Sequence, residues 1–181
     1  RIIPKANTLR KGILLYRGIR YRKGFGFIPF VFNLITKVIE ERCQYYSFYD
    51  IELIRKQLLF QDDEITYPDR QQKEDAPPQI GRIVEREAIR PKHGALLFRL
   101  ANYFKSKHIL QFGPSMGLST LYLTSYASDT EIDRLENVPE FAPSPVIAFG
   151  KAARNPVDLR VGRYKDLLPK ALKDMEQLDF V

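Results

Sequence analysis

A glycine-containing turn between an apolar run and a helical pattern constrains the fold of this chain more than any other feature. The turn reads Gly-Pro-Ser-Met-Gly over residues 113–117 and follows the run His-Ile-Leu-Gln-Phe at 108–112. A short apolar run of this kind is strand-like, and the apolar residues at 118–126 have helical spacing. In doubly wound α/β folds, the first turn from a strand into a helix faces the ligand crevice. The sequence therefore predicts a strand, a ligand-facing turn and a helix.

The same alternation of strand-like and helical segments continues on both sides of the turn. Strands are expected at 108–112, 130–135, 157–161 and 178–181, and helices at 82–89, 95–105, 118–126, within 139–153 and at 164–175. This alternation predicts βαβ units, and hence an α/β fold with a parallel sheet and flanking helices. Because the chain stops within the last apparent strand, we expect the sheet to be incomplete at the C-terminus and to be completed by further sequence or by a partner.

The segment preceding this alternation has a different character. Residues 61–80 are polar and contain three prolines, which is typical of a linker or mobile loop. We expect a basic arm and helical extension over 1–60, with helices beginning near Phe30 and Asp50, and the main domain over 81–181.

The net charge of +7 is concentrated at the N-terminus. Residues 1–39 contain nine cations and no acid, whereas the rest of the chain has 29 − 9 = 20 cations and 22 acids. A basic segment can contact nucleic acid, an acidic partner or anionic lipid, and it can equally be a solvated arm. No run approaches the roughly 18 apolar residues of a membrane span, and the single cysteine excludes an internal disulfide. We expect a soluble, cytoplasmic protein.

The turn has the wrong glycines for a dinucleotide-binding loop. The motif G-x-G-x-x-G would place its glycines at Gly113, Ser115 and Leu118, and two of these three positions carry other residues. A pyrophosphate group would therefore be poorly accommodated.

The same residues also spell the nucleophile elbow G-x-S-x-G, with Ser115 as the nucleophile. That mechanism requires a histidine base later in the chain. The two histidines, His93 and His108, both precede Ser115, so this sequence supplies no base for a hydrolase.

A third motif fits better, namely acidic-x-G-x-G-x-G, with Gln111 at the acidic position and Ser115 at the middle glycine. The segment ILQFGPSMGLSTLYLTSYA resembles motif I of class I, Rossmann-like methyltransferases that use S-adenosylmethionine, especially bacterial O-methyltransferase-like proteins. The resemblance covers residues 94–181. It implies S-adenosylmethionine as the cofactor and methyl transfer to an acceptor, which we expect to be an oxygen of a small molecule.

The resemblance also implies a set of residues that contact the cofactor. They are Gln111, Gly113, Pro114, Ser115, Gly117, Ser119, Glu136 and Arg163. Glu136 ends the second expected strand, 136 − 113 = 23 residues after Gly113, where an acid can accept hydrogen bonds from both ribose hydroxyls. Arg163 follows the third strand and would border the adenine. Gln111 lacks the family's negative charge, and a charge-assisted hydrogen bond is roughly twice as strong as a neutral one, so we expect weaker cofactor binding.

The sequence leaves the catalytic residues unknown. Neither His93 nor His108 is a convincing base, and the acidic residue with which relatives bind metal or catalyse would fall after Val181, so no metal ligand is assigned. Two alternatives stay open. The chain could be a catalytically degenerate binding protein of the same fold, or an RNA methyltransferase that holds nucleic acid with its basic arm. A homo-oligomer is also possible.

Overall fold

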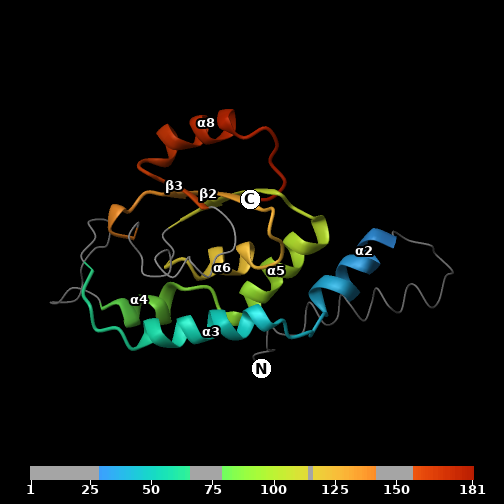
Figure 1. Cartoon of the computed structure of the whole chain (residues 1–181), viewed down its shortest axis with the longest axis horizontal. Helices are drawn as coiled ribbons and strands as arrows, with labels where there is room; N and C mark the ends of the chain where they lie inside the picture. The colour runs from blue at the N-terminus through green and yellow to red at the C-terminus, as the bar shows by residue number, and fades with distance from the viewer. Residues whose placement is uncertain (1–28, 66–78, 114–115, 142–156) are drawn as a thin grey trace, which may run out of the picture. The chain divides into compact units, whose positions relative to one another are not determined.

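The structure is a computed structural model, and it describes residues 29–65, 79–113, 116–141 and 157–181 (Figure 1). The chain divides into two compact units, Arg1–Cys43 and Gln44–Val181, and each is described by itself.

The described part of the first unit is helical. Helix α2 (Pro29–Leu34) continues directly into a π-helical turn, η1 (Ile35–Ile39), in which Val38 is buried. The π turn is closed by the hydrogen bond that the Glu40 N–H donates to the Ile35 carbonyl at 2.8 Å. The helix expected near Phe30 is therefore confirmed.

The second unit contains a parallel sheet of three strands, β1 (His108–Phe112), β2 (Glu131–Glu136) and β3 (Val157–Val161), with β2 in the middle. His108 is paired with Glu131, and Ile132 is paired with Val157. The predicted parallel α/β sheet is confirmed.

The C-terminal segment lies along the other edge of β1. Ile109 and Phe180 form a parallel bridge, and the Leu110 N–H donates to the Phe180 carbonyl at 2.9 Å. The strand expected at 178–181 is thus present as a single bridge. Counting this segment as a fourth position, the strands lie in the order 3-2-1-4, which is the order of the Rossmann fold.

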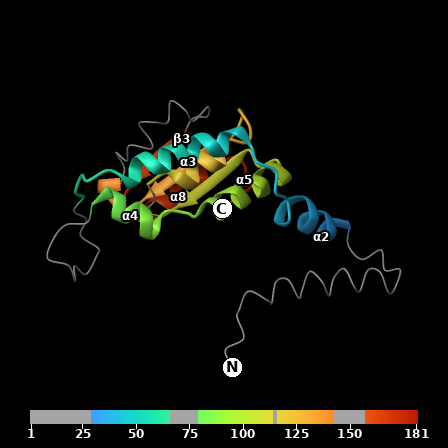
Figure 2. The same cartoon turned by 90° about the horizontal axis from the view of Figure 1, so that it is seen from below.

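Helices cover both faces of the sheet. Helix α8 (Tyr164–Asp174) lies on one face, and α3 (Tyr46–Leu59), α4 (Ile80–Glu87), α5 (Pro91–Phe104) and α6 (Leu118–Thr124) lie on the other (Figures 1 and 2). On the α8 face, Leu110 and Leu135 pack against Ala171. On the opposite face, Ile109 and Ile132 pack against Ala101 and Leu123. Apolar residues of β1 and β2 therefore pack on both faces of the sheet, as expected for strands that are buried on both sides.

Aromatic side chains hold α3 against α5 and α6. Phe48 of α3 lies 5.0 Å from Phe98 of α5 and 5.4 Å from Tyr122 of α6, measured between ring centroids. All three rings are buried, and burial of each side chain stabilises the fold by roughly 1.5–3 kcal/mol. Gly94 of α5 allows this packing, because a Cβ atom there would lie 2.3 Å from the Tyr122 ring.

Three expected boundaries differ from the structure. Helix α5 begins at Pro91 rather than at residue 95, because a proline in the first helical position loses no hydrogen bond. Helix α3 begins at Tyr46 rather than near Asp50. The sequence pattern does not reveal its first turn, because Tyr46 and Tyr49 are exposed and give no apolar periodicity. Of the helix expected within 139–153, the structure describes a 3-10 turn, η2 (Pro139–Phe141), and the remainder lies outside the described residues.

The two ends of the expected linker at 61–80 are held together. Glu64 and Gln79 form an antiparallel bridge, and the Ile80 N–H donates to the Asp63 carbonyl at 2.8 Å. Residues 66–78 lie outside the described residues. Within the described ranges, no helix combines the length and the apolar character needed to cross a membrane.

Candidate functional site

The carboxyl ends of the three strands meet at one edge of the sheet. The Gly113 N–H, just after β1, donates to the Leu135 carbonyl at 3.4 Å, and the Gly162 N–H, just after β3, donates to the Glu136 carbonyl at 2.8 Å. These bonds continue the parallel register beyond the strands. They place the first residues of two βα turns on either side of Glu136.

The backbone of the β1–α6 turn is open to a ligand at Gly113. Gly113 has φ +108° and Gly117 has φ +88°, values that residues with a Cβ rarely adopt. A Cβ atom at Gly113 would meet nothing within 4 Å, so the space beside this backbone is not filled by the protein's described atoms. Gly117 is the N-cap residue of α6. Pro114 and Ser115, also predicted to contact the cofactor, lie outside the described residues.

The structure brings Gln111 and Ser119 together. The Gln111 amide nitrogen donates to the Ser119 hydroxyl at 2.7 Å, and the Thr120 hydroxyl donates to the Gln111 amide oxygen at 2.8 Å. Gln111 is 9% exposed. A primary amide has two N–H donors and two acceptor positions, so these contacts use half of its capacity. They tie the end of β1 to the first turn of α6 and thereby hold the shape of the turn.

Glu136 forms a buried ion pair with Arg134, its neighbour two residues earlier on β2. The Glu136 Oε2 atom lies 3.0 Å from Arg134 Nη2, and the Val138 N–H donates to Oε1 at 3.0 Å. Both side chains are 0% exposed. A buried ion pair is costly to desolvate, and its loss on one side leaves an uncompensated charge, so the pair holds this carboxylate firmly at the strand end.

Tyr164 is a site residue that the sequence reasoning missed. Its hydroxyl donates to the Asn137 side-chain oxygen at 2.9 Å, and its ring meets the Phe112 ring edge-on at 5.6 Å. Burial, and then the negative charge of Glu136, raise the pKa of Tyr164. Tyr164 therefore links α8 to the ends of β1 and β2. The sequence feature that could have identified Tyr164 is its position two residues after Gly162, in the turn that leads from the third strand into a helix.

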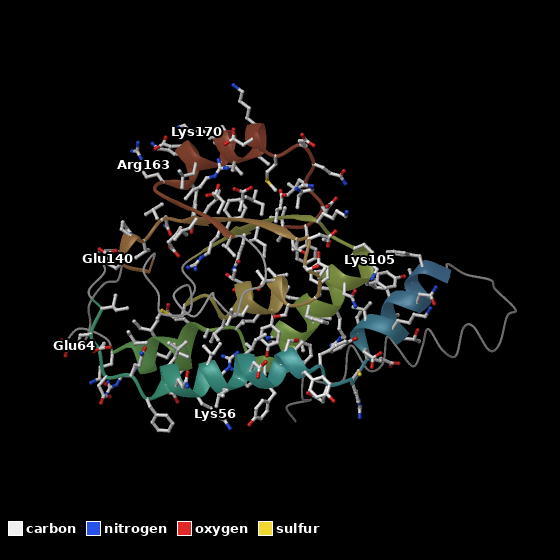
Figure 3. All side chains as sticks on the ribbon, viewed as in Figure 1. Lys56, Glu64, Lys105, Glu140, Arg163 and Lys170 are labelled. Carbon is white, nitrogen blue, oxygen red and sulfur yellow. The ribbon has the colours of Figure 1, made fainter. Side chains whose placement is uncertain are left out.

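Arg163 follows Gly162, and the contact that the structure gives its side chain is with α8. Its Nε atom donates to the Asp166 carboxylate at 2.8 Å, and the side chain is 74% exposed at the start of α8 (Figure 3). His93 is exposed in the first turn of α5. His108 begins β1, about 13 Å along the strand from its carboxyl end. His108 is therefore too far from the carboxyl ends of the strands to act as a base there.

A hollow of about 500 Å³ lies at the opposite edge, by the amino ends of β1 and β2. Arg160 is one of the residues that line the hollow, and it forms ion pairs with Asp133, Asp158 and Asp174 at 2.6–3.0 Å. These pairs join β2, β3 and α8, so we interpret the hollow as part of the structural frame. Among the described residues, no group of three or more His, Cys, Asp or Glu side chains is arranged to hold a metal ion.

Comparisons with known proteins give similarity to solved structures alone, since no family model and no curated protein matches the sequence. The O-methyltransferase from Bacillus cereus in complex with SAH is 17% identical, with TM-score 0.47, over 80% of this chain and 54% of that one. The SAH-bound methyltransferase PaMTH1 from Podospora anserina is 16% identical, with TM-score 0.49, over 99% of this chain and 60% of that one. This chain therefore spans little more than half the length of either. Similarity at this level assigns no chemistry to it.

Proposed function

We propose that this chain binds S-adenosylmethionine at the carboxyl edge of β1 and β2 and supports transfer of its methyl group to an oxygen of a small molecule. The observation that carries the proposal is the open backbone at Gly113 beside the carboxylate of Glu136 on the neighbouring strand. The first offers close approach to a ligand, and the second offers acceptors for ribose hydroxyls.

The strand order supports a ligand at this position. In open α/β sheets, ligands bind outside the carboxyl ends of the strands, where the strand order reverses. Here β2 lies on one side of β1 and Phe180 on the other, so the order reverses at β1. The turn at Gly113 stands at the carboxyl end of that same strand.

The residues of the candidate site fit the cofactor, provided that the carboxylate of Glu136 becomes accessible on binding. Among the described residues, each Glu136 oxygen accepts one hydrogen bond, from Arg134 or from Val138, which leaves a second lone pair for a ribose hydroxyl. The carboxylate is fully buried, so binding must uncover it. The neighbouring Tyr164–Asn137 hydrogen bond is exposed, so it can open at little cost, because water replaces the partner of an exposed bond.

The bound cofactor would supply a methyl group activated on a sulfonium sulfur. The contribution of the chain is to hold donor and acceptor in line, and positioning alone can contribute several kcal/mol. Gln111 and Ser119 would act by holding the turn, while Gly113 and Gly117 would give the cofactor access to the backbone. An oxygen acceptor would also need a base or a metal ion, and neither is assigned among the described residues.

Calorimetric titration with S-adenosylmethionine and S-adenosylhomocysteine tests the proposal. We expect binding by the folded chain, and a loss of affinity of about 10-fold or more in a Glu136→Gln variant that circular dichroism shows to be folded, because one charged hydrogen-bond acceptor contributes about 1.5–3 kcal/mol. The matched control is Asp133→Asn, a carboxylate on the same strand that also pairs with an arginine but lies at the hollow on the opposite edge. Absence of binding by the folded chain, or full affinity in Glu136→Gln, would contradict the proposal.

Gln111 favours one alternative, a binding protein of the same fold without catalysis. It replaces a charged residue with an amide whose described contacts are internal. Gln111→Glu tests for the cofactor site that methyl transfer requires. An active methyltransferase should gain affinity for S-adenosylmethionine through the added charge, whereas a chain without a cofactor site should show none in either form. An RNA acceptor would be recognised by affinity that falls steeply with salt.

A further inference from the structure

The side of the candidate site formed by β1 and α6 is uncharged. Residues 109–128, which run from the second residue of β1 through the Gly113 turn and α6, contain no Asp, Glu, Lys, Arg or His. Polar side chains next to the turn bond to one another, since the Gln111 amide donates to the Ser119 hydroxyl and accepts from the Thr120 hydroxyl. A ligand that lies against this turn therefore meets neutral groups.

The charges on the neighbouring strand cancel. Gln111 is paired with Arg134 in the parallel register, and Glu136 follows two residues later, so the three side chains lie on one face of the sheet. Arg134 and Glu136 form the buried ion pair described above, with their nearest atoms 3.0 Å apart. The carboxylate thus neutralises the guanidinium beside Gln111. Among the described residues, this part of the site has no net charge.

The charges that follow β3 are paired as well. The Arg163 side chain donates to the Asp166 carboxylate at 2.8 Å, at the start of α8. The acid that remains near this edge is Glu140, in the turn η2 after β2 (Figure 3). Apart from Glu140, the acids described at the carboxyl edge therefore already face a cation of this chain.

Both S-adenosylmethionine and S-adenosylhomocysteine join a nucleoside to an amino-acid end that carries an ammonium and a carboxylate. With the ribose at Glu136, and the adenine expected beside Arg163, the amino-acid end lies against the Gly113 turn. Burying an ammonium is costly unless a partner of opposite charge compensates for the lost water. The side chain that the turn offers is that of Gln111, and its amide is neutral.

We propose that Gln111 makes the site selective for the nucleoside part of its ligand, so that neutral adenine nucleoside thioethers bind as well as S-adenosylhomocysteine does. The simplest such ligand is 5′-methylthioadenosine, which lacks the charged amino-acid end. This inference rests on the proposed function, because it requires a nucleoside at Glu136. The carboxylate of Glu136 would contribute affinity through the ribose in both ligands, whereas the ammonium gains no charged partner. The class of ligand is thereby wider than the methyl donor and its product.

The substitution Gln111→Glu tests this selectivity closely, because it changes the charge and keeps the shape. The Thr120 hydroxyl can donate to a carboxylate as it does to the amide, and the Ser119 hydroxyl can rotate to donate instead of accept. Arg134 would then stand beside two carboxylates, and the local charge would become negative. An ammonium gains an attraction there that a neutral nucleoside does not.

Calorimetric titration of the whole chain with S-adenosylhomocysteine and with 5′-methylthioadenosine measures the selectivity. We expect the two dissociation constants of the wild type to agree within about threefold, or 5′-methylthioadenosine to bind more tightly, because the charged end gains no partner. In Gln111→Glu, their ratio should move by about 10-fold or more in favour of S-adenosylhomocysteine, because a charge-assisted hydrogen bond replaces a neutral one. The matched control is Asn102→Asp, the same change of charge on α5, which should leave the ratio as in the wild type.

The outcomes separate this inference from the proposed function, once circular dichroism has shown that each variant is folded. If the wild type binds S-adenosylhomocysteine more than about threefold more tightly than 5′-methylthioadenosine, or if Gln111→Glu leaves the ratio unchanged, the inference is overturned while the proposed function stands. A Glu140→Gln variant that weakens S-adenosylhomocysteine alone would also overturn it, by showing a charged partner for the ammonium. Binding of neither ligand by the wild type would overturn both proposals. Binding of 5′-methylthioadenosine alone would support the inference and contradict the proposed function.

Discussion

Gly94 and Tyr122 show how a single residue without a side chain sets the distance between two helices. A Cβ atom at Gly94 would lie 2.3 Å from Cε2 and 2.8 Å from Cζ of the Tyr122 ring. The ring cannot give way easily, because it is 1% exposed and its hydroxyl donates to Glu52 at 2.7 Å. The close approach of α5 and α6 therefore depends on glycine at this position.

We expect Gly94→Ala to lower the free energy of unfolding by about 1–3 kcal/mol through overpacking. Urea denaturation followed by circular dichroism measures this change. Tyr122→Leu removes the Cε2 and Cζ atoms, so the penalty of Gly94→Ala should be smaller in that background than in the wild type. An equal penalty in both backgrounds would show that the ring is not the cause.

At the same scale, the sequence predicted which residues lie at the candidate site better than what they contact. The motif spacing predicted Gln111, Gly113 and Glu136, and the structure places all three at one edge of the sheet. It could not predict that Gln111 bonds to the start of α6, or that Arg134 would be buried beside Glu136. Those contacts depend on side-chain direction and depth, which a spacing pattern does not contain.

At the scale of elements, the carboxylate of Asp179 fastens the C-terminal segment to the start of β1. Its Oδ2 atom accepts hydrogen bonds from the N–H groups of Lys107 and His108 at 2.8 and 3.0 Å. These two backbone bonds, that of His108 first, hold the pKa of Asp179 below its usual value. The bridge between Ile109 and Phe180 lies next to this anchor.

The lowered pKa predicts a specific pH dependence. A carboxyl group whose pKa is lower in the folded than in the unfolded chain stabilises the fold above the unfolded value, about 3.9. That stabilisation is lost as the pH falls through the folded value. The stability difference between wild type and Asp179→Asn should therefore be present at neutral pH and vanish in acid, as measured by denaturation at several pH values. Glu176→Gln, which removes a nearby exposed carboxylate, is the control, and a pH-independent difference for Asp179→Asn would contradict the assignment.

The elements themselves were largely predictable, and the exceptions have physical reasons. The three strands and the α6 and α8 helices were expected from short apolar runs and from helical spacing in the sequence, and the structure contains all five. The first turn of α3 was missed because Tyr46 and Tyr49 point outward. Phe48, in the same turn, is buried in the core, so the turn mixes buried and exposed aromatic residues and its sequence shows no single apolar face.

At the scale of the whole unit, the candidate cofactor site and the outer side of α3 are different parts of the structure. The candidate site lies at the carboxyl edge of the sheet, whereas α3 lies in the helix layer that includes α6 (Figure 1). Tyr49 and Leu53 are exposed on α3, and neither is among the residues proposed to contact the cofactor. Changes at these exposed positions should therefore leave cofactor binding intact.

Leu53→Asp is the variant that checks this separation. We expect its affinity for S-adenosylhomocysteine to equal that of the wild type within twofold, because Leu53 is exposed on α3. Calorimetry makes the comparison, and circular dichroism verifies that the variant is folded. A large loss of affinity in a folded Leu53→Asp variant would show that α3 and the cofactor site are coupled.

The ion pair between Arg134 and Glu136 also limits how this sequence can change over generations. Loss of either charge alone leaves the other buried, at a cost of about 3–5 kcal/mol, whereas replacing both by apolar residues of similar volume is often neutral or stabilising. Descendants should therefore keep both charges or lose both. A lineage that loses both can keep its fold while it discards the carboxylate proposed to hold the ribose, so two substitutions separate this chain from a stable form without that proposed site.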